Sequence, residues 1–214
     1  MNRKEFIKVE NSRATAFNVF TALLCQPGED LTTQNDIFDV LIGELGALSS
    51  EGADFARRMK AEVGNYSSKE LLIEYTKLFL GPFKVLAPPY SSIYFGRKQL
   101  VSDETIWVAN FYQKAGLQFD KELKDLPDHA AVESEFMYYL IFNELIEIES
   151  GNLNKCNEFY NYQKDFFNSH YKEWIPKFCI QIVKQSGNSY YKMLAHCLNS
   201  FITTVSIPEF NPEK

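Results

Sequence analysis

Asp128, His129 and Glu133 are the residues whose types and spacing could support chemistry. They lie in the stretch LPDHAAVESEF, residues 126–136, in which Glu133 follows the histidine by four positions. On a helix, side chains four residues apart project from one face, which suits two metal ligands or an acid–base pair. The same stretch could also be the start of a helix that carries no chemistry.

A metal-dependent hydrolase centred on Asp128, His129 and Glu133 is the first hypothesis. A catalytic metal site normally uses three protein ligands. The chain has only two further histidines, His170 and His196, and it has no H-E-x-x-H motif. The order Asp-His also differs from the His-Asp pair of the phosphohydrolases. The hydrolase therefore stays open as an alternative.

The helix-start hypothesis explains more of the stretch. Asp125 can cap the helix, Pro127 is tolerated in its first turn, and Asp128 can interact with the positive end of the helix dipole. The last interaction contributes about 0.3–1 kcal/mol. This hypothesis gives no role to His129.

Other catalytic and nucleotide-binding motifs are absent from the sequence. It contains no G-x-x-x-x-G-K-[ST] phosphate loop, no G-x-G-x-x-G and no G-x-S-x-G. The formal net charge of −6 argues against nucleic acid as the partner, because phosphate binding requires a basic surface.

The elements that must position these residues are helical. The 214 residues are 45% hydrophobic and 15% aromatic, enough for the core of a folded protein. Apolar residues recur at helical spacing along nearly the whole chain, and glycines and prolines separate the segments. The pattern predicts an all-α fold, a single domain over residues 1–214 with about eight or nine helices.

Residues 81–101, GPFKVLAPPYSSIYFGRKQLV, interrupt this pattern. The segment has three prolines and two glycines, several aromatic residues and no sustained period. Pro88 and Pro89 remove backbone donors and push Ala87 out of the helical region. We expect a loop rich in proline and aromatic residues, helical at most in its second half.

The sequence predicts a cytoplasmic protein. No two of the four cysteines form a C-x-x-C pair, and each lies among apolar residues, as expected of reduced thiols. The N-terminus lacks the features of a secretory signal peptide. No apolar run approaches the about 18 residues of a membrane span, so we expect no stable membrane insertion.

Three segments together resemble one family. They are EYTKLFLGPFKVLAPPYSSIY, LPDHAAVESEFM and QKDFFNSHYKEWIPKF, which occur in this order between about residues 70 and 180. Each is similar to a signature segment of the TorD/DmsD/NarJ group, cytoplasmic chaperones for molybdenum-cofactor redox enzymes. The ordered set is far more specific than any one segment.

The resemblance implies an all-α protein with no catalysis and no cofactor of its own. Such chaperones bind the twin-arginine signal peptide, and often the body, of an apo-molybdoenzyme catalytic subunit. They delay export until the cofactor is loaded, and they occur as monomers and domain-swapped dimers. The peptide-binding residues implied by the motifs are Tyr75, Leu78, Phe79, Tyr90, Tyr94, Arg97, Asp128 and His129.

The chemistry of these residues suits that role. The apolar part of a signal peptide needs aromatic and aliphatic anchors. Its guanidinium groups need a carboxylate, for which Asp128 is the candidate, and His129 would make binding depend on pH. Family members often have tryptophan where this chain has Tyr75 or Tyr90, which leaves the client open. A helical adaptor with an unrelated client is the second alternative.

Overall fold

The computed structural model describes residues 1–28, 31, 36–81, 84–96, 102–117 and 125–209. Within these ranges the regular elements are all helices, and the single β contact is an isolated bridge between Tyr90 and His129. The prediction of an all-α fold is confirmed. No described helix is long and apolar enough to cross a membrane.

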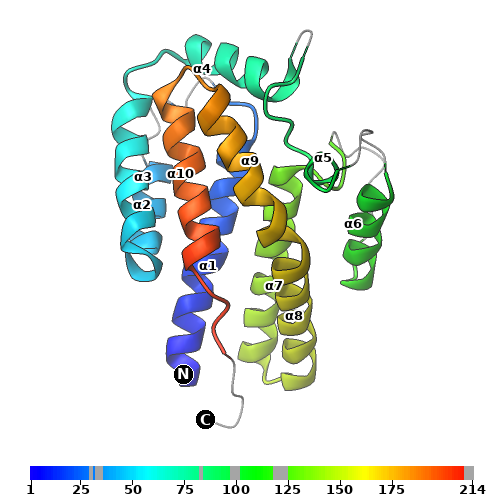
Figure 1. Cartoon of the computed structure of the whole chain (residues 1–214). Helices are drawn as coiled ribbons and strands as arrows, with labels where there is room; N and C mark the ends of the chain where they lie inside the picture. The colour runs from blue at the N-terminus through cyan, green and yellow to red at the C-terminus, as the bar shows by residue number, and fades with distance from the viewer. Residues whose placement is uncertain (29–30, 32–35, 82–83, 97–101, 118–124, 210–214) are drawn as a thin grey trace.

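Several of the helices form one continuous bundle (Figure 1). In chain order the elements are α1 (Arg3–Leu24), α2 (Asp36–Leu48), α3 (Ser50–Val63), α4 (Ser68–Tyr75), the π-helix η2 (Thr76–Leu80), α5 (Ser91–Tyr94), α6 (Asp103–Lys114), α7 (Ala130–Ser150), α8 (Leu153–Phe166), the π-helix η3 (Phe167–Tyr171), α9 (Lys172–Gln185) and α10 (Ser189–Thr204). Because η2 continues α4, and η3 joins α8 to α9, the described part agrees with the expected eight or nine helices.

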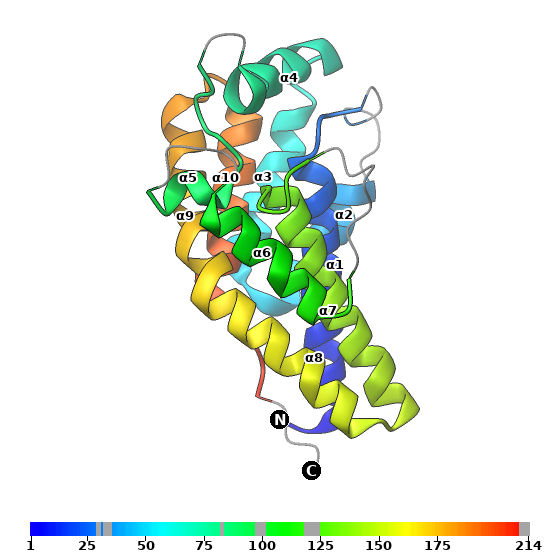
Figure 2. The ribbon, with the colours of Figure 1, turned by 90° about the vertical axis from the view of Figure 1, so that its right-hand side faces the viewer.

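Aromatic rings join the helices at the centre of the bundle. Phe17 of α1 lies edge-on to Tyr171 of η3 and to Phe201 of α10, with ring centroids 5.8 and 5.0 Å apart. All three side chains are buried. The helix α7 packs between α1 and α8, and α6 crosses outside them (Figure 2). Apolar burial of this kind is the main force that holds an α-helical bundle together.

The predicted start of the helix after Asp125 is wrong. The helix α7 begins at Ala130 with His129 as its N-cap, so Asp125 does not cap it. Residues 126–129 form a turn instead, closed by a bond from His129 N to Leu126 O of 3.1 Å. Pro176 lies inside α9 and not at its start. Pro176 has no N–H to donate to the helix, so one backbone hydrogen bond is missing there. The wider turn of the π-helix η3 ends at Tyr171, five residues before Pro176.

The predicted loop is confirmed where it is described. Residues 84–90 are non-helical, and only the single turn of α5 follows them. Gly81, which ends η2, has a φ of +57°, and a Cβ there would lie 2.7 Å from the backbone of Lys84. Only glycine tolerates both the conformation and the close approach, so Gly81 fixes where the loop leaves the helix.

Candidate functional site

The loop and the start of α7 are joined by backbone hydrogen bonds. Ala130 N donates to Pro89 O at 2.8 Å, and Ser91 N donates to Asp128 O at 2.9 Å. Between these bonds lies the bridge of Tyr90 and His129. Two of the sequence segments singled out above therefore form one structural unit, called here the loop–α7 junction.

Asp128 holds α5 in place. Its side chain is fully buried, and its Oδ2 accepts a hydrogen bond from Ser92 N at 3.2 Å. Within the described part of the chain, Oδ1 has no hydrogen-bond partner. The carboxylate thus satisfies a backbone donor at the start of a short helix, and in this conformation it has no surface open to solvent.

His129 has a structural role at the same junction. Its Nδ1 accepts from Ala131 N at 3.1 Å, so a neutral ring carries its proton on Nε2. The ring lies edge-on to Tyr90, with centroids 5.3 Å apart. Burial lowers the pKa of His129 and outweighs the carboxylates of Asp125 and Asp128, which raise it. The imidazole is therefore neutral at pH 7.

Replacing His129 by alanine is expected to lower the free energy of unfolding by about 1 kcal/mol, through loss of the N-cap. His129→Asn supplies another acceptor at the N-cap and should cost less. Urea denaturation at pH 7 compares the two variants. Equal losses for alanine and asparagine would show that the Tyr90 contact, and not the cap, is what the ring supplies.

The predicted residues of α4 and η2 face the core. Tyr75, Leu78 and Phe79 are all at least 94% buried. Phe79 has its ring 5.0 Å from that of Tyr75 and 5.8 Å from that of Phe178. The outer face of this helix carries other apolar residues, among them Ile73, which is 57% exposed.

Tyr94 belongs to the same aromatic cluster. It stacks on Trp174 at 5.6 Å and meets Phe178 at 6.1 Å. The structure therefore connects Tyr94 with Phe79 through Phe178. Arg97 lies outside the described residues.

Exposed acidic groups lie beside the junction. Asp125 and Glu135 are exposed, and Tyr90 is half-buried. Burial raises the pKa of the Cys25 thiol, and the carboxylates of Asp125 and Glu135 raise it further. Asp125 also contributes, after burial, to the raised pKa of Tyr90. We call Cys25, Tyr90, Asp125 and Glu135 the acidic corner; sequence reasoning gave none of its carboxylates a binding role.

Glu133 pairs with residues far away in the sequence. Its Oε2 accepts from Trp174 Nε1 at 2.7 Å, and its Oε1 lies 2.8 Å from His170 Nε2. The other ring nitrogen of His170 lies 2.9 Å from Glu104 of α6. Although burial alone would lower the pKa of His170, the two carboxylates raise it to about 9. The ring is therefore a buried imidazolium at pH 7.

This pairing bears on the hydrolase hypothesis. Glu133 is engaged by His170 and Trp174, and the Nδ1 of His129 is engaged by the backbone of α7. Among the described residues, no group of three or more His, Cys, Asp and Glu side chains is arranged to hold a metal ion.

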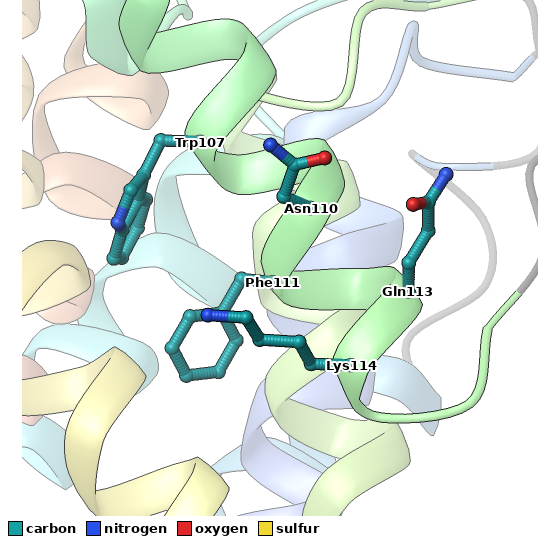
Figure 3. A pocket seen from close by; sticks show the side chains of 5 residues that line it. All are labelled: Trp107, Asn110, Phe111, Gln113 and Lys114. Atoms are coloured by element: carbon teal, nitrogen blue, oxygen red, sulfur yellow. The ribbon is translucent and has the colours of Figure 1, made fainter.

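A shallow pocket lies on α6. It has a volume of about 480 Å³ and is lined by Trp107, Asn110, Phe111, Gln113 and Lys114 (Figure 3). None of the predicted peptide-binding residues lines it. Trp107 is 39% exposed, and its inner side contacts His170 with ring centroids 5.0 Å apart.

The sequence of this region matches a known protein family. Residues 45–180, more than half of the chain, match the family described as nitrate reductase delta subunit. The chain belongs to this family. The matched region includes the loop, the α7 start and the His170–Trp174 segment. The resemblance to the TorD/DmsD/NarJ group is thereby confirmed.

Individual relatives of the chain agree with this family assignment. The chain is 30% identical over 140 residues to "Chaperone protein TorD" of Vibrio parahaemolyticus, an alignment that covers 64% of this chain and 63% of the relative, less than two thirds of its length. TorD of Photobacterium profundum is 27% identical over 208 residues, which cover 92% of this chain and 94% of that protein. "Tat proofreading chaperone DmsD" of Salmonella typhi is 22% identical over 130 residues, 60% of this chain and 57% of the relative. These relatives are named chaperones, not enzymes.

A solved structure has the same fold. The putative redox enzyme maturation protein from Archaeoglobus fulgidus superposes with a TM-score of 0.55 at 22% identity, covering 88% of this chain and 93% of the other. At this identity the likeness concerns the arrangement of the helices alone.

Proposed function

We propose that this protein is a maturation chaperone for a molybdenum-cofactor oxidoreductase. It binds the twin-arginine signal peptide of the cofactor-free catalytic subunit and delays export until the cofactor is in place. The observation that carries the proposal is the family match over residues 45–180, which spans all three signature segments. Relatives named TorD chaperone and Tat proofreading chaperone DmsD support the kind of partner.

The loop–α7 junction fits peptide recognition. Tyr90 is half-buried, so one side of its ring can meet a ligand while the other packs on His129. Aromatic side chains held in this way bind at a low cost in conformational entropy. Asp128 and His129 act by holding the loop against α7, and they position Tyr90.

The remaining predicted residues support this surface from below. Tyr75, Leu78, Phe79 and Tyr94 are largely buried; Leu78 O accepts a hydrogen bond from Ala87 N of the loop at 2.8 Å, and Phe79 and Tyr94 both contact Phe178. A preorganised loop loses less freedom when it binds a ligand. Arg97 remains a candidate contact for the peptide.

The cytoplasm is the proposed location. All four cysteines are free thiols, and three of them are buried. Reduced cysteines are typical of a reducing compartment. A chaperone that acts before export must meet its client on that side of the membrane.

Titration calorimetry with a synthetic twin-arginine signal peptide tests the proposal. Saturable one-to-one binding is expected, weakened by about 1–3 kcal/mol when both arginines are replaced by lysine, because bidentate charge-assisted bonds are lost. Tyr90→Ala should weaken binding comparably, whereas Tyr162→Ala, a partly buried tyrosine on α8, serves as the matched control. A folded protein that binds no such peptide would refute the proposal.

A further inference from the structure

The helix α7 carries a row of apolar side chains, one half-buried and two exposed. Tyr138, Phe142 and Ile146 follow one another at four-residue spacing, so they lie on one face of the helix. Phe142 is 46% and Ile146 44% exposed, and the rings of Tyr138 and Phe142 stack at 5.6 Å. Contiguous apolar side chains in water mark an interaction surface more often than isolated ones do.

The N-terminal end of this row is acidic. Glu135 is exposed and precedes Tyr138 by three residues on the same helix. Asp125 is exposed just before α7 begins, and both carboxylates are close enough to Cys25 to raise the pKa of its thiol, after the larger effect of burial. Cys25 follows the last residue of α1, which packs along α7. The acidic corner and the apolar row are therefore continuous.

We propose that this face of α7 is the docking surface for the apolar stretch of the signal peptide, with the two arginines at Asp125 and Glu135. We name Tyr138, Phe142 and Ile146 the α7 row. The proposal rests on the proposed function and deepens it, since it states where the peptide lies and in which direction it runs.

The charges on this surface, and their order relative to the apolar side chains, favour a twin-arginine signal peptide as the occupant. A twin-arginine signal peptide presents two adjacent cations followed by a short apolar stretch, and the surface presents carboxylates followed by apolar side chains. From Glu135 to Ile146 the helix rises about 16 Å, the length of about three turns of a bound helical segment. Exposed carboxylates are also reached by guanidinium groups without the desolvation that the buried Asp128 would require.

Two other occupants fit less well. An anionic lipid surface would be repelled by the carboxylates of the acidic corner. A second copy of this chain, with a net charge of −6, would bring like charges together when the two α7 helices pair in parallel. Both occupants are distinguishable outcomes of the experiment below.

Fluorescence anisotropy with a labelled synthetic peptide tests the surface. The probe carries two arginines followed by about a dozen leucine and alanine residues, a length within reach of the row. The double variant Phe142→Ser/Ile146→Ser is expected to bind it roughly tenfold more weakly or worse, because two apolar anchors are lost. Ile180→Ser on α9 is the matched control, because Ile180 is 50% exposed and lies on another helix.

Exchanging the charges of the protein and the peptide tests in which direction the peptide runs along α7. Glu135→Lys should weaken binding of the arginine peptide and improve binding of a peptide in which both arginines are glutamate. Compensation of this kind requires the two charges to be close, so a variant that merely perturbs α7 would not produce it.

The outcomes separate this inference from the proposed function. If the unmodified protein binds no twin-arginine peptide, both are overturned. If it binds and the row variant binds equally well, the α7 row is overturned and the chaperone function stands. The row is also overturned if Ile180→Ser is as damaging, if the unmodified protein binds anionic vesicles through the row, or if sedimentation shows a dimer that the row variant abolishes.

Discussion

Glu133→Ala is expected to lower the free energy of unfolding by about 3–5 kcal/mol, because it leaves buried groups without their partner. The removed carboxylate accepts from Trp174 and pairs with His170 in an environment with no solvent access. Among the described residues, the His170 imidazolium would keep Glu104 as its one carboxylate partner, and Glu104 is 21% exposed. Urea denaturation followed by circular dichroism measures the loss.

The matched control lies two residues further along α7. Glu135→Ala removes an exposed carboxylate from the same helix and should change the free energy of unfolding by no more than about 0.5 kcal/mol. Glu133→Gln keeps an acceptor for Trp174 and should fall between the two. A loss for Glu133→Ala as small as that for Glu135→Ala would mean that the network contributes nothing to stability.

The pH dependence of stability supplies a second readout. The pKa of His170 is about 9 in the folded protein and near its ordinary value of about 6.5 in the unfolded chain. Because the folded-state value is the higher one, the stabilisation is complete below about pH 6.5 and is lost as the pH rises through about 9. The total stabilisation lost across this range of pH is roughly 3 kcal/mol. His170→Gln should flatten this part of the curve.

The network of Glu133, His170 and Trp174 separates what the sequence predicts from what only the fold decides. Helical periodicity and the prolines of the loop are local properties, so they predicted the all-α fold and the break before Tyr90. Which carboxylate meets which histidine is not local. Glu133 is four residues from His129 but pairs with His170, 37 residues away, because η3 brings that ring against α7. Spacing within one helix contains no information about such a contact.

Asp128 shows the same limit within the candidate site. Its type and position suggested a contact for arginine, whereas its burial depends on a hydrogen bond from Ser92, 36 residues earlier. Asp125 and Glu135, the exposed carboxylates proposed to contact arginine, lie beside and within residues 126–136. No local sequence pattern distinguishes them from the buried Asp128. The motif predicts the region of the candidate site, and the packing of the loop decides which carboxylates of that region face solvent.

Arg13→Ala is the second change expected to have a large effect, about 3–5 kcal/mol, through a different buried network. Nη1 of Arg13 donates to Glu10 Oε1 at 2.5 Å and to Gln163 Oε1 at 2.9 Å, and Gln163 donates in turn to Glu144. All four side chains are buried, and they join α1, α7 and α8. Without the guanidinium, two buried carboxyl groups would remain with no cation beside them.

The protonation states make this prediction specific. Burial, together with the nearby Glu10, raises the pKa of Glu144 to about 9, so Glu144 is neutral at pH 7 and Arg13 balances mainly Glu10. Arg13→Ala/Glu10→Ala removes both charges and should therefore be less destabilising than the sum of the two single changes. Arg57→Ala, which breaks an exposed pair with Asp54, is the surface control and should cost less than about 1 kcal/mol. Strict additivity of Arg13→Ala and Glu10→Ala would show that their charges are not coupled, and the junction of α1 with α7 and α8 would then rest on apolar packing alone.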